Sequence, residues 1–122
     1  MITRRALLAG TAGLLAAPAQ AQAPDGLRAR AAAKGLLYGA ATANYELKDG
    51  DFRDVLSREA AIIVPEYEMK RDLIEPASGR FDFSAPDALL GYAQANGLSL
   101  RGHPLVWYAA NPPWLEGSVR ET

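Results

Sequence analysis

The stretch Ala61-Ile62-Ile63-Val64-Pro65-Glu66-Tyr67-Glu68-Met69-Lys70 decides the fold class of this chain. Its first four residues are apolar and rich in β-branched side chains, which predicts a buried strand, and Pro65 predicts the end of that strand. Charged and aromatic residues follow immediately. Because parallel α/β proteins bind ligands beyond the carboxyl ends of their strands, the stretch predicts a buried parallel strand with a binding site at its end.

Helix and strand patterns alternate on both sides of this stretch. The sequence predicts a helix over 27–34, a strand over 36–41, a helix over 52–59, the strand over 61–64, a long connection over 66–83, a helix from 84 that ends at Asn96-Gly97, and a third strand that begins at 98–103 and ends with 105–107. This alternation predicts right-handed βαβ crossovers and a parallel sheet.

The two longer helices have apolar faces that are expected to pack on the sheet. The residues expected to be buried are Phe52, Val55 and Leu56 in the first of them, and Leu89, Leu90 and Ala93 in the second. Ser84-Ala85-Pro86-Asp87 has the pattern of a capping box, so the Ser84 side chain is expected to cap the second helix.

The composition excludes several classes of chemistry. The 122 residues are 49% hydrophobic and 22% charged with a net charge of -1, which is ordinary for a globular domain and shows no basic excess for nucleic acid. No cysteine is present, which excludes disulfides and thiolate sites. His103 is the single histidine, so motifs that need a histidine pair are excluded. We expect no metal and no cofactor.

Residues 1–21 resemble a cleaved export signal. Arg4 and Arg5 precede an uncharged run over 6–17 that is too short to span a bilayer, and Ala19-Gln20-Ala21 offers a cleavage site. The paired arginines favour a twin-arginine signal, with an ordinary secretory signal as the alternative. We therefore expect an exported protein, periplasmic or extracellular, whose mature part over 22–122 has no membrane attachment.

Two glutamates follow the second strand. Glu66 and Glu68 would share a face of an extended segment, and glycosidases use two carboxylates. Neighbours on one strand cannot easily lie on opposite sides of a bond, however. We therefore expect one glutamate to face a ligand and the other to be solvated or paired with Lys70 or Arg71.

The other candidate residues each have a structural alternative. Lys70 could be a solvated surface lysine, His103 a hydrogen-bonded core histidine, and Trp107 and Trp114 simple packing residues. Aromatic faces beside charged hydrogen-bonding groups also suit sugars, because a sugar ring has apolar C–H faces and polar hydroxyl edges.

From Gly35 onward the sequence resembles glycoside hydrolase family 10, the endo-1,4-β-xylanases. The blocks that carry the resemblance, in family order and spacing, are Gly39-Ala40-Ala41, Pro65-Glu66-Tyr67-Glu68-Met69-Lys70, Glu75-Pro76-Ala77-Ser78-Gly79-Arg80-Phe81-Asp82-Phe83, Arg101-Gly102-His103-Pro104-Leu105-Val106-Trp107 and Pro113-Trp114. The resemblance implies a (β/α)8 TIM barrel, of which this chain would form about three βα units. It also implies retaining hydrolysis of xylan or a related β-1,4-linked polysaccharide, with no obligate protein partner.

The resemblance assigns substrate binding to four residues: Glu66, Lys70, His103 and Trp107. Four positions depart from the family pattern. Tyr67 stands where the family usually has Asn, Arg71 where Trp is usual, Pro104 where Thr is usual, and Tyr108 where His is usual. Tyr67 and Tyr108 therefore predict an altered subsite.

The family's two catalytic glutamates lie on strands four and seven, beyond the third strand of this chain. We therefore expect no catalytic residue here, and the chain to be a truncated, inactive part of a xylanase. The alternative is a non-catalytic exported carbohydrate-binding or assembly module derived from that barrel.

Overall fold

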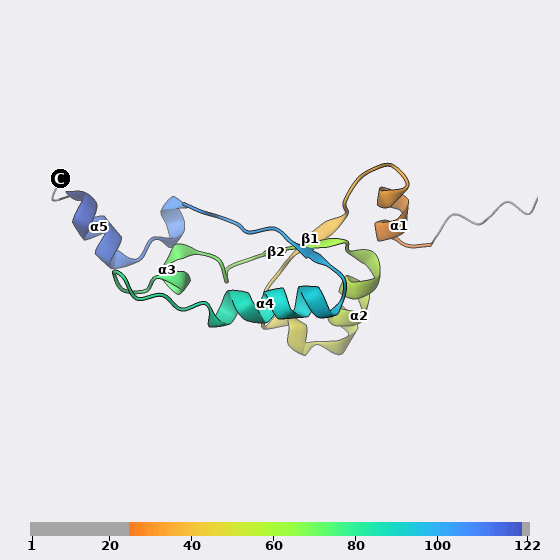
Figure 1. Ribbon diagram of the computed structural model, residues 1–122, viewed down its shortest axis with the longest axis horizontal. Coiled ribbons are helices and arrows are strands. Elements are labelled where there is room, and N and C mark those ends of the chain that lie inside the picture. The colour runs from red at the N-terminus through yellow and green to blue at the C-terminus, as the bar shows by residue number, and fades with distance from the viewer. Residues whose placement is uncertain (1–24, 121–122) are drawn as a thin grey trace, which may run out of the picture.

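A three-stranded parallel sheet organises the molecule. The computed structural model describes residues 25–120, and the expected export signal lies outside the described residues. The strands pair in the order β1-β2-β3: β1 Gly39–Thr42, β2 Ile62–Pro65 and β3 Ser99–Leu100. Figure 1 shows the sheet near the middle of an elongated chain, with α4 running alongside it. The predicted parallel α/β arrangement is confirmed.

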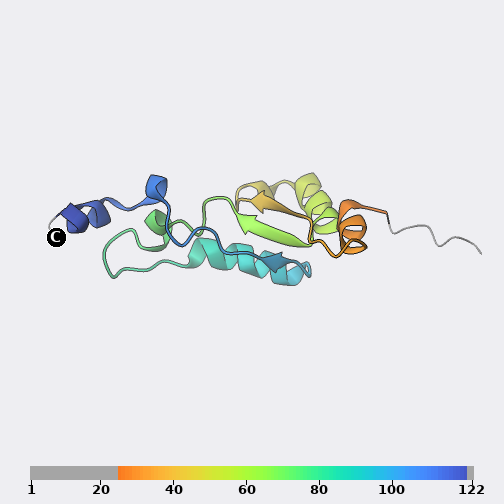
Figure 2. The ribbon, with the colours of Figure 1, turned by 90° about the horizontal axis from the view of Figure 1, so that it is seen from above.

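Five helices and two 3-10 turns connect the strands and extend from them. They are α1 Leu27–Ala32, η1 Glu46–Lys48, α2 Gly50–Glu59, α3 Arg71–Ile74, α4 Ser84–Ala95, η2 Tyr108–Ala110 and α5 Pro113–Arg120. In Figure 2, α3 lies beyond the carboxyl ends of the strands and α1 lies at the opposite end of the molecule. Within residues 25–120, no helix has the length and apolar character needed to cross a membrane.

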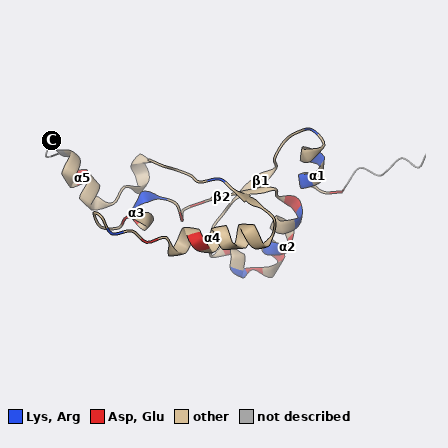
Figure 3. Ribbon diagram, viewed as in Figure 1, with Lys and Arg blue, Asp and Glu red and all other residues tan. Residues whose placement is uncertain are grey.

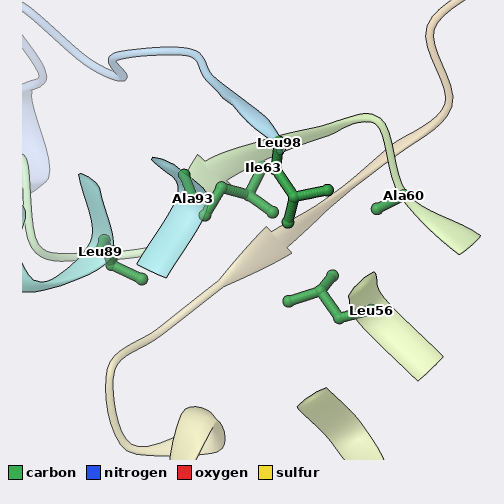
Figure 4. Packing of buried hydrophobic residues seen from close by; sticks show 6 residues of the cluster. All are labelled: Leu56, Ala60, Ile63, Leu89, Ala93 and Leu98. Carbon is green, nitrogen blue, oxygen red and sulfur yellow. The ribbon is translucent and has the colours of Figure 1, made fainter. Parts of the chain in front are cut away.

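The hydrophobic core lies between the sheet and the helices α2 and α4. Its buried members are Leu56, Ala60, Ile63, Leu89, Ala93 and Leu98 (Figure 4). Ile63 and Leu89 are completely buried. Asp87 is the only charged residue in the α4 sequence, in keeping with a helix that lies along the sheet (Figure 3). The expected core positions Leu56, Leu89 and Ala93 are confirmed.

Two expected core residues are exposed instead. Val55 is 50% exposed and Leu90 is 40% exposed, and Phe52 is only partly buried at the margin of the core. Each of these positions is next to, or one turn from, a buried core residue of its helix, Leu56 or Leu89. Because only three short strands lie beneath the helices, a narrow stripe of each helix is covered and the flanking apolar positions are not.

The first strand begins later than predicted. Leu36 and Leu37 are 61% and 69% exposed and precede β1. The register pairs Gly39 with Ile62. On the N-terminal side of this pair, the hydrogen bond from the Ala61 N–H to the Tyr38 carbonyl joins the two segments. The apolar run over 36–41 therefore begins before the first residue that pairs with β2, and only its second half forms a strand.

The third strand is shorter than predicted. It ends at Leu100, and Leu105 and Val106 lie outside it, 97% and 75% exposed. The Arg101 N–H still donates to the Ile63 carbonyl at 2.9 Å. The next bond of the parallel ladder would need an N–H on Pro65, which proline lacks, so the pairing stops there.

The start of α4 is capped by a residue that the capping-box pattern did not indicate. The Ser84 side chain makes no cap hydrogen bond; instead the Ser84 backbone N–H donates to Asp82 Oδ1 at 2.9 Å. Hydrogen bonds from Ser84 hold the pKa of the Asp82 carboxyl below its ordinary value. The predicted helix is thus confirmed and its predicted cap is wrong.

Candidate functional site

One open hollow extends along β1 and reaches the carboxyl end of β2 and the segment after β3. Its volume is about 550 Å³, and we call it the strand-end hollow. The residues that line it are Gly39, Ala40, Ala41, Val64, Pro65, Glu66, Lys70, Arg101, His103 and Trp107. Small and apolar strand residues form its floor, and polar and aromatic residues surround that floor. All four residues predicted to bind substrate lie together in this hollow.

Lys70 is held between two aromatic rings. Its Nζ lies 4.7 Å from the centroid of the Trp107 ring and 4.8 Å from the centroid of the Tyr67 ring. It also donates a hydrogen bond to the Glu66 backbone carbonyl. The residue is only 9% exposed, so the alternative of a solvated surface lysine is wrong. An ammonium flanked by rings on two sides has few rotamers available, which orients its remaining donors.

Glu66 and Glu68 have different environments. Glu66 is exposed and lines the strand-end hollow. Glu68 is 6% exposed, and its oxygens accept hydrogen bonds from the backbone N–H groups of Asn44 at 2.6 Å and Tyr67 at 3.2 Å. Of the two glutamates, only Glu66 lines the hollow. The expected partner was wrong, because Glu68 joins the loop after β1 to the loop after β2 instead of pairing with Lys70 or Arg71.

His103 and Trp107 reach the hollow from the extended segment after β3. His103 is exposed, so the alternative of a buried core histidine is wrong. Trp107 is 41% exposed, and one of its faces is directed at the Lys70 ammonium. Tyr108 packs edge-on against Trp107 with the ring centroids 6.0 Å apart. Tyr108 is itself 85% exposed and is not among the residues lining the hollow.

The Tyr67 ring contacts the Lys70 ammonium, but Tyr67 is not among the residues that line the hollow. Its hydroxyl donates a hydrogen bond to the Asp72 carboxylate. That hydrogen bond raises the pKa of the Tyr67 phenol, since removing the proton would leave two anions in contact. The phenol therefore stays protonated and donating throughout the neutral range.

A second group of residues beside the hollow was not predicted as a unit. Arg71 Nη2 lies 3.0 Å from Glu75 Oε2, and the Arg71 guanidinium lies 5.2 Å from the centroid of the Trp114 ring. Trp114 Nε1 donates to the Glu75 carbonyl at 2.9 Å. The i,i+4 spacing of Arg71 and Glu75 is a sequence signal for their pairing, but nothing local indicates Trp114. This group fixes α5 against α3 and its C-terminal end.

Arg101 is the lining residue that sequence reasoning missed. It follows β3 directly and is exposed at the hollow. Its place one residue beyond the last strand position was the available signal. Within residues 25–120, Glu66 is the only carboxylate that lines the hollow, and no group of three or more potential metal ligands occurs.

This set of groups suits a neutral polyhydroxylated ligand. A carboxylate accepts hydrogen bonds from hydroxyls, an ammonium donates them, and an indole face covers an apolar ring face. A glycosidase that cleaves its substrate needs two opposed carboxylates. The described part of the hollow provides one.

Comparison with known proteins gives a consistent result. The family model for glycosyl hydrolase family 10 matches residues 26–122. Endo-1,4-beta-xylanase A from Phanerodontia chrysosporium is 42% identical over 92 residues, which cover 73% of this chain and 22% of that protein. Endo-1,4-beta-xylanase 2 from Claviceps purpurea is 35% identical over 81 residues, which cover 66% of this chain and 25% of that protein. The chain thus spans about a quarter or less of the length of these relatives.

Solved structures of xylanases share the fold of this chain. Xylanase 10B from Thermotoga petrophila, solved with xylobiose, superposes with a TM-score of 0.70 at 31% identity, over 77% of this chain and 30% of that one. An endo-β-1,4-xylanase from Gloeophyllum trabeum gives 0.71 at 36% identity, over 75% of this chain and 30% of that one. The sheet and its helices are therefore part of a (β/α)8 barrel, and the chain belongs to glycosyl hydrolase family 10.

Proposed function

We propose that this chain supplies the xylan-binding part of an endo-1,4-β-xylanase cleft. The observation that carries the proposal is the strand-end hollow, which unites Glu66, Lys70 and Trp107. The two relatives described above are endo-1,4-beta-xylanases, and one solved relative was crystallised with xylobiose. Xylobiose presents hydroxyls for the two charged side chains and apolar ring faces for the indole.

In this proposal the residues of the hollow bind sugar and do not cleave it. Glu66 accepts hydrogen bonds from sugar hydroxyls, Lys70 donates to them, and His103 and Trp107 line the position next to the bond that is cleaved. Retaining cleavage uses a nucleophile and an acid/base on opposite sides of that bond. Glu66 alone does not meet this requirement, so the 122-residue chain by itself is proposed to be inactive.

The proposal is tested by titrating the whole 122-residue chain with xylotriose and with cellotriose while recording NMR spectra. We expect saturable xylotriose shifts at Lys70 and at the Trp107 indole, and weaker binding of cellotriose, whose extra hydroxymethyl groups must fit the same hollow. Absence of xylotriose shifts at both residues would contradict the proposal. Xylotriose binding without release of reducing sugar from xylan is expected for the 122-residue chain both in this proposal and in the alternative, a non-catalytic carbohydrate-binding or assembly module. Release of reducing sugar from xylan by the 122-residue chain would contradict its proposed inactivity.

We also propose that the protein is exported and that residues 1–21 are removed. The support is the sequence pattern of paired arginines, an apolar run and a small-x-small site. Mass spectrometry of the exported protein is expected to give Gln22 as the first residue. Replacing Arg4 and Arg5 by lysine together is expected to stop twin-arginine export; unchanged export of this variant would indicate the ordinary secretory route.

A further inference from the structure

We propose that Asp72 is a positioning residue that holds Tyr67 and, through the Tyr67 ring, orients Lys70 in the strand-end hollow. The sugar-binding part of this inference rests on the proposed function. Asp72 does not line the hollow, so its effect would pass through other side chains. Two contacts in series, Asp72 with Tyr67 and Tyr67 with Lys70, connect it to the site.

The Asp72 carboxylate is fixed at both of its oxygens. Oδ1 accepts a hydrogen bond from the Leu73 backbone N–H at 3.0 Å, within α3, and Oδ2 accepts the hydrogen bond from the Tyr67 hydroxyl. Among the described residues Asp72 forms no salt bridge, so these two donors are its partners. The carboxylate thus connects the tyrosine to the backbone of a helix.

Tyr67 depends on this connection because it is not buried. The residue is 42% exposed, and its hydroxyl has Asp72 as its hydrogen-bond acceptor. Packing alone leaves a half-exposed tyrosine free to change its χ1 rotamer. With the hydroxyl held by Asp72, the ring face stays directed at the Lys70 ammonium, 4.8 Å away.

Lys70 then has a defined place. Trp107 flanks the ammonium on one side, Tyr67 flanks it on another, and the Glu66 carbonyl accepts one of its three donors. Removing the Tyr67 ring from this position leaves one flank open to water. The ammonium would then occupy several rotamers, and only some of them would direct its free donors into the hollow.

The test uses the full-length protein and three variants: Asp72→Ala, Asp72→Asn and Tyr67→Phe. The first readout is the upfield ring-current shift of the Lys70 methylene protons beside the ammonium, measured by NMR without ligand. We expect this shift to fall in Asp72→Ala and Tyr67→Phe and to be largely retained in Asp72→Asn, whose amide oxygen still accepts the hydrogen bond. Xylobiose affinity is expected to fall about threefold to tenfold in the first two variants and to be mostly restored in the third.

Asp87→Ala serves as the matched control, since Asp87 is also an acidic residue in the first turn of a helix, in α4, and does not line the hollow. Wild-type Lys70 shifts and wild-type affinity in both Asp72→Ala and Tyr67→Phe would overturn the inference. Should Asp72→Ala fail to fold, Tyr67→Phe decides alone, because it removes only the hydroxyl. A wild-type protein that does not bind xylobiose would contradict the proposed function, while the Lys70 shifts would still decide the role of Asp72.

Discussion

Replacing Gly39 by alanine is expected to lower the free energy of unfolding by about 2–4 kcal/mol and to loosen β1 from β2. Gly39 is paired with Ile62 at the start of the sheet. A Cβ atom at Gly39 would lie against the Ile62 carbonyl oxygen and 2.5 Å from Ile62 Cγ2, closer than any side chain tolerates. Because the carbonyl belongs to the backbone of the neighbouring strand, relief requires the strands to move apart.

Urea unfolding of the full-length protein measures this effect, with Gly91→Ala as the control. Gly91 lies within α4, and a Cβ there would meet no atom within 4 Å. Alanine in place of a helical glycine is expected to stabilise the protein by about 0.5–1 kcal/mol. Equal changes in the two variants would show that the close approach of β1 and β2 at Gly39 does not occur.

Replacing Lys70 by methionine is expected to weaken xylotriose binding about tenfold to a hundredfold. Methionine retains most of the aliphatic stem of this buried lysine but removes the charged donor that lies beside the Tyr67 and Trp107 rings. A donor that forms charge-assisted hydrogen bonds to hydroxyls contributes more to affinity than a neutral one. The loss is therefore expected in binding, with little change in the folded structure.

Isothermal titration with xylotriose measures the affinity of this variant, and an amide NMR spectrum checks its fold. Lys48→Met is the matched control, because Lys48 is an exposed lysine in η1 that does not line the strand-end hollow. We expect this control to bind as the wild type does. Wild-type affinity in Lys70→Met would remove Lys70 from the proposed binding site.

The sequence predicted the elements that depend on local composition. The β-branched run before Pro65 forms β2, and the apolar residues Leu89 and Ala93 form the buried stripe of α4. The positions at which strands start and end were predicted less well. Pairing decides them, and the pairing partner of Gly39 lies in a separate part of the chain. A periodic pattern cannot contain that information.

The candidate site shows the same division. Residue types and their position after the strands indicated Glu66, Lys70, His103 and Trp107, and the structure brings these four residues into one hollow. The sequence could not distinguish Glu66 from Glu68. Both follow the same strand, and Glu68 is distinguished by a long-range hydrogen bond from the backbone N–H of Asn44, in the loop after β1, which the local sequence does not indicate.

By itself the sequence determined the order of the three strands and of α1, α2 and α4, the parallel sheet and the family, because these follow from local periodicity and from residues that occur in a fixed order. It did not predict α3, which lies within the expected connection over 66–83, or α5. Only the tertiary structure decided which glutamate faces the hollow and how Lys70 is held. Those outcomes depend on contacts between different loops, such as Glu68 with the Asn44 backbone and Lys70 with Trp107. Lys70 follows β2 and Trp107 follows β3. Their contact forms because the two strands pair side by side, which brings the segments after them together.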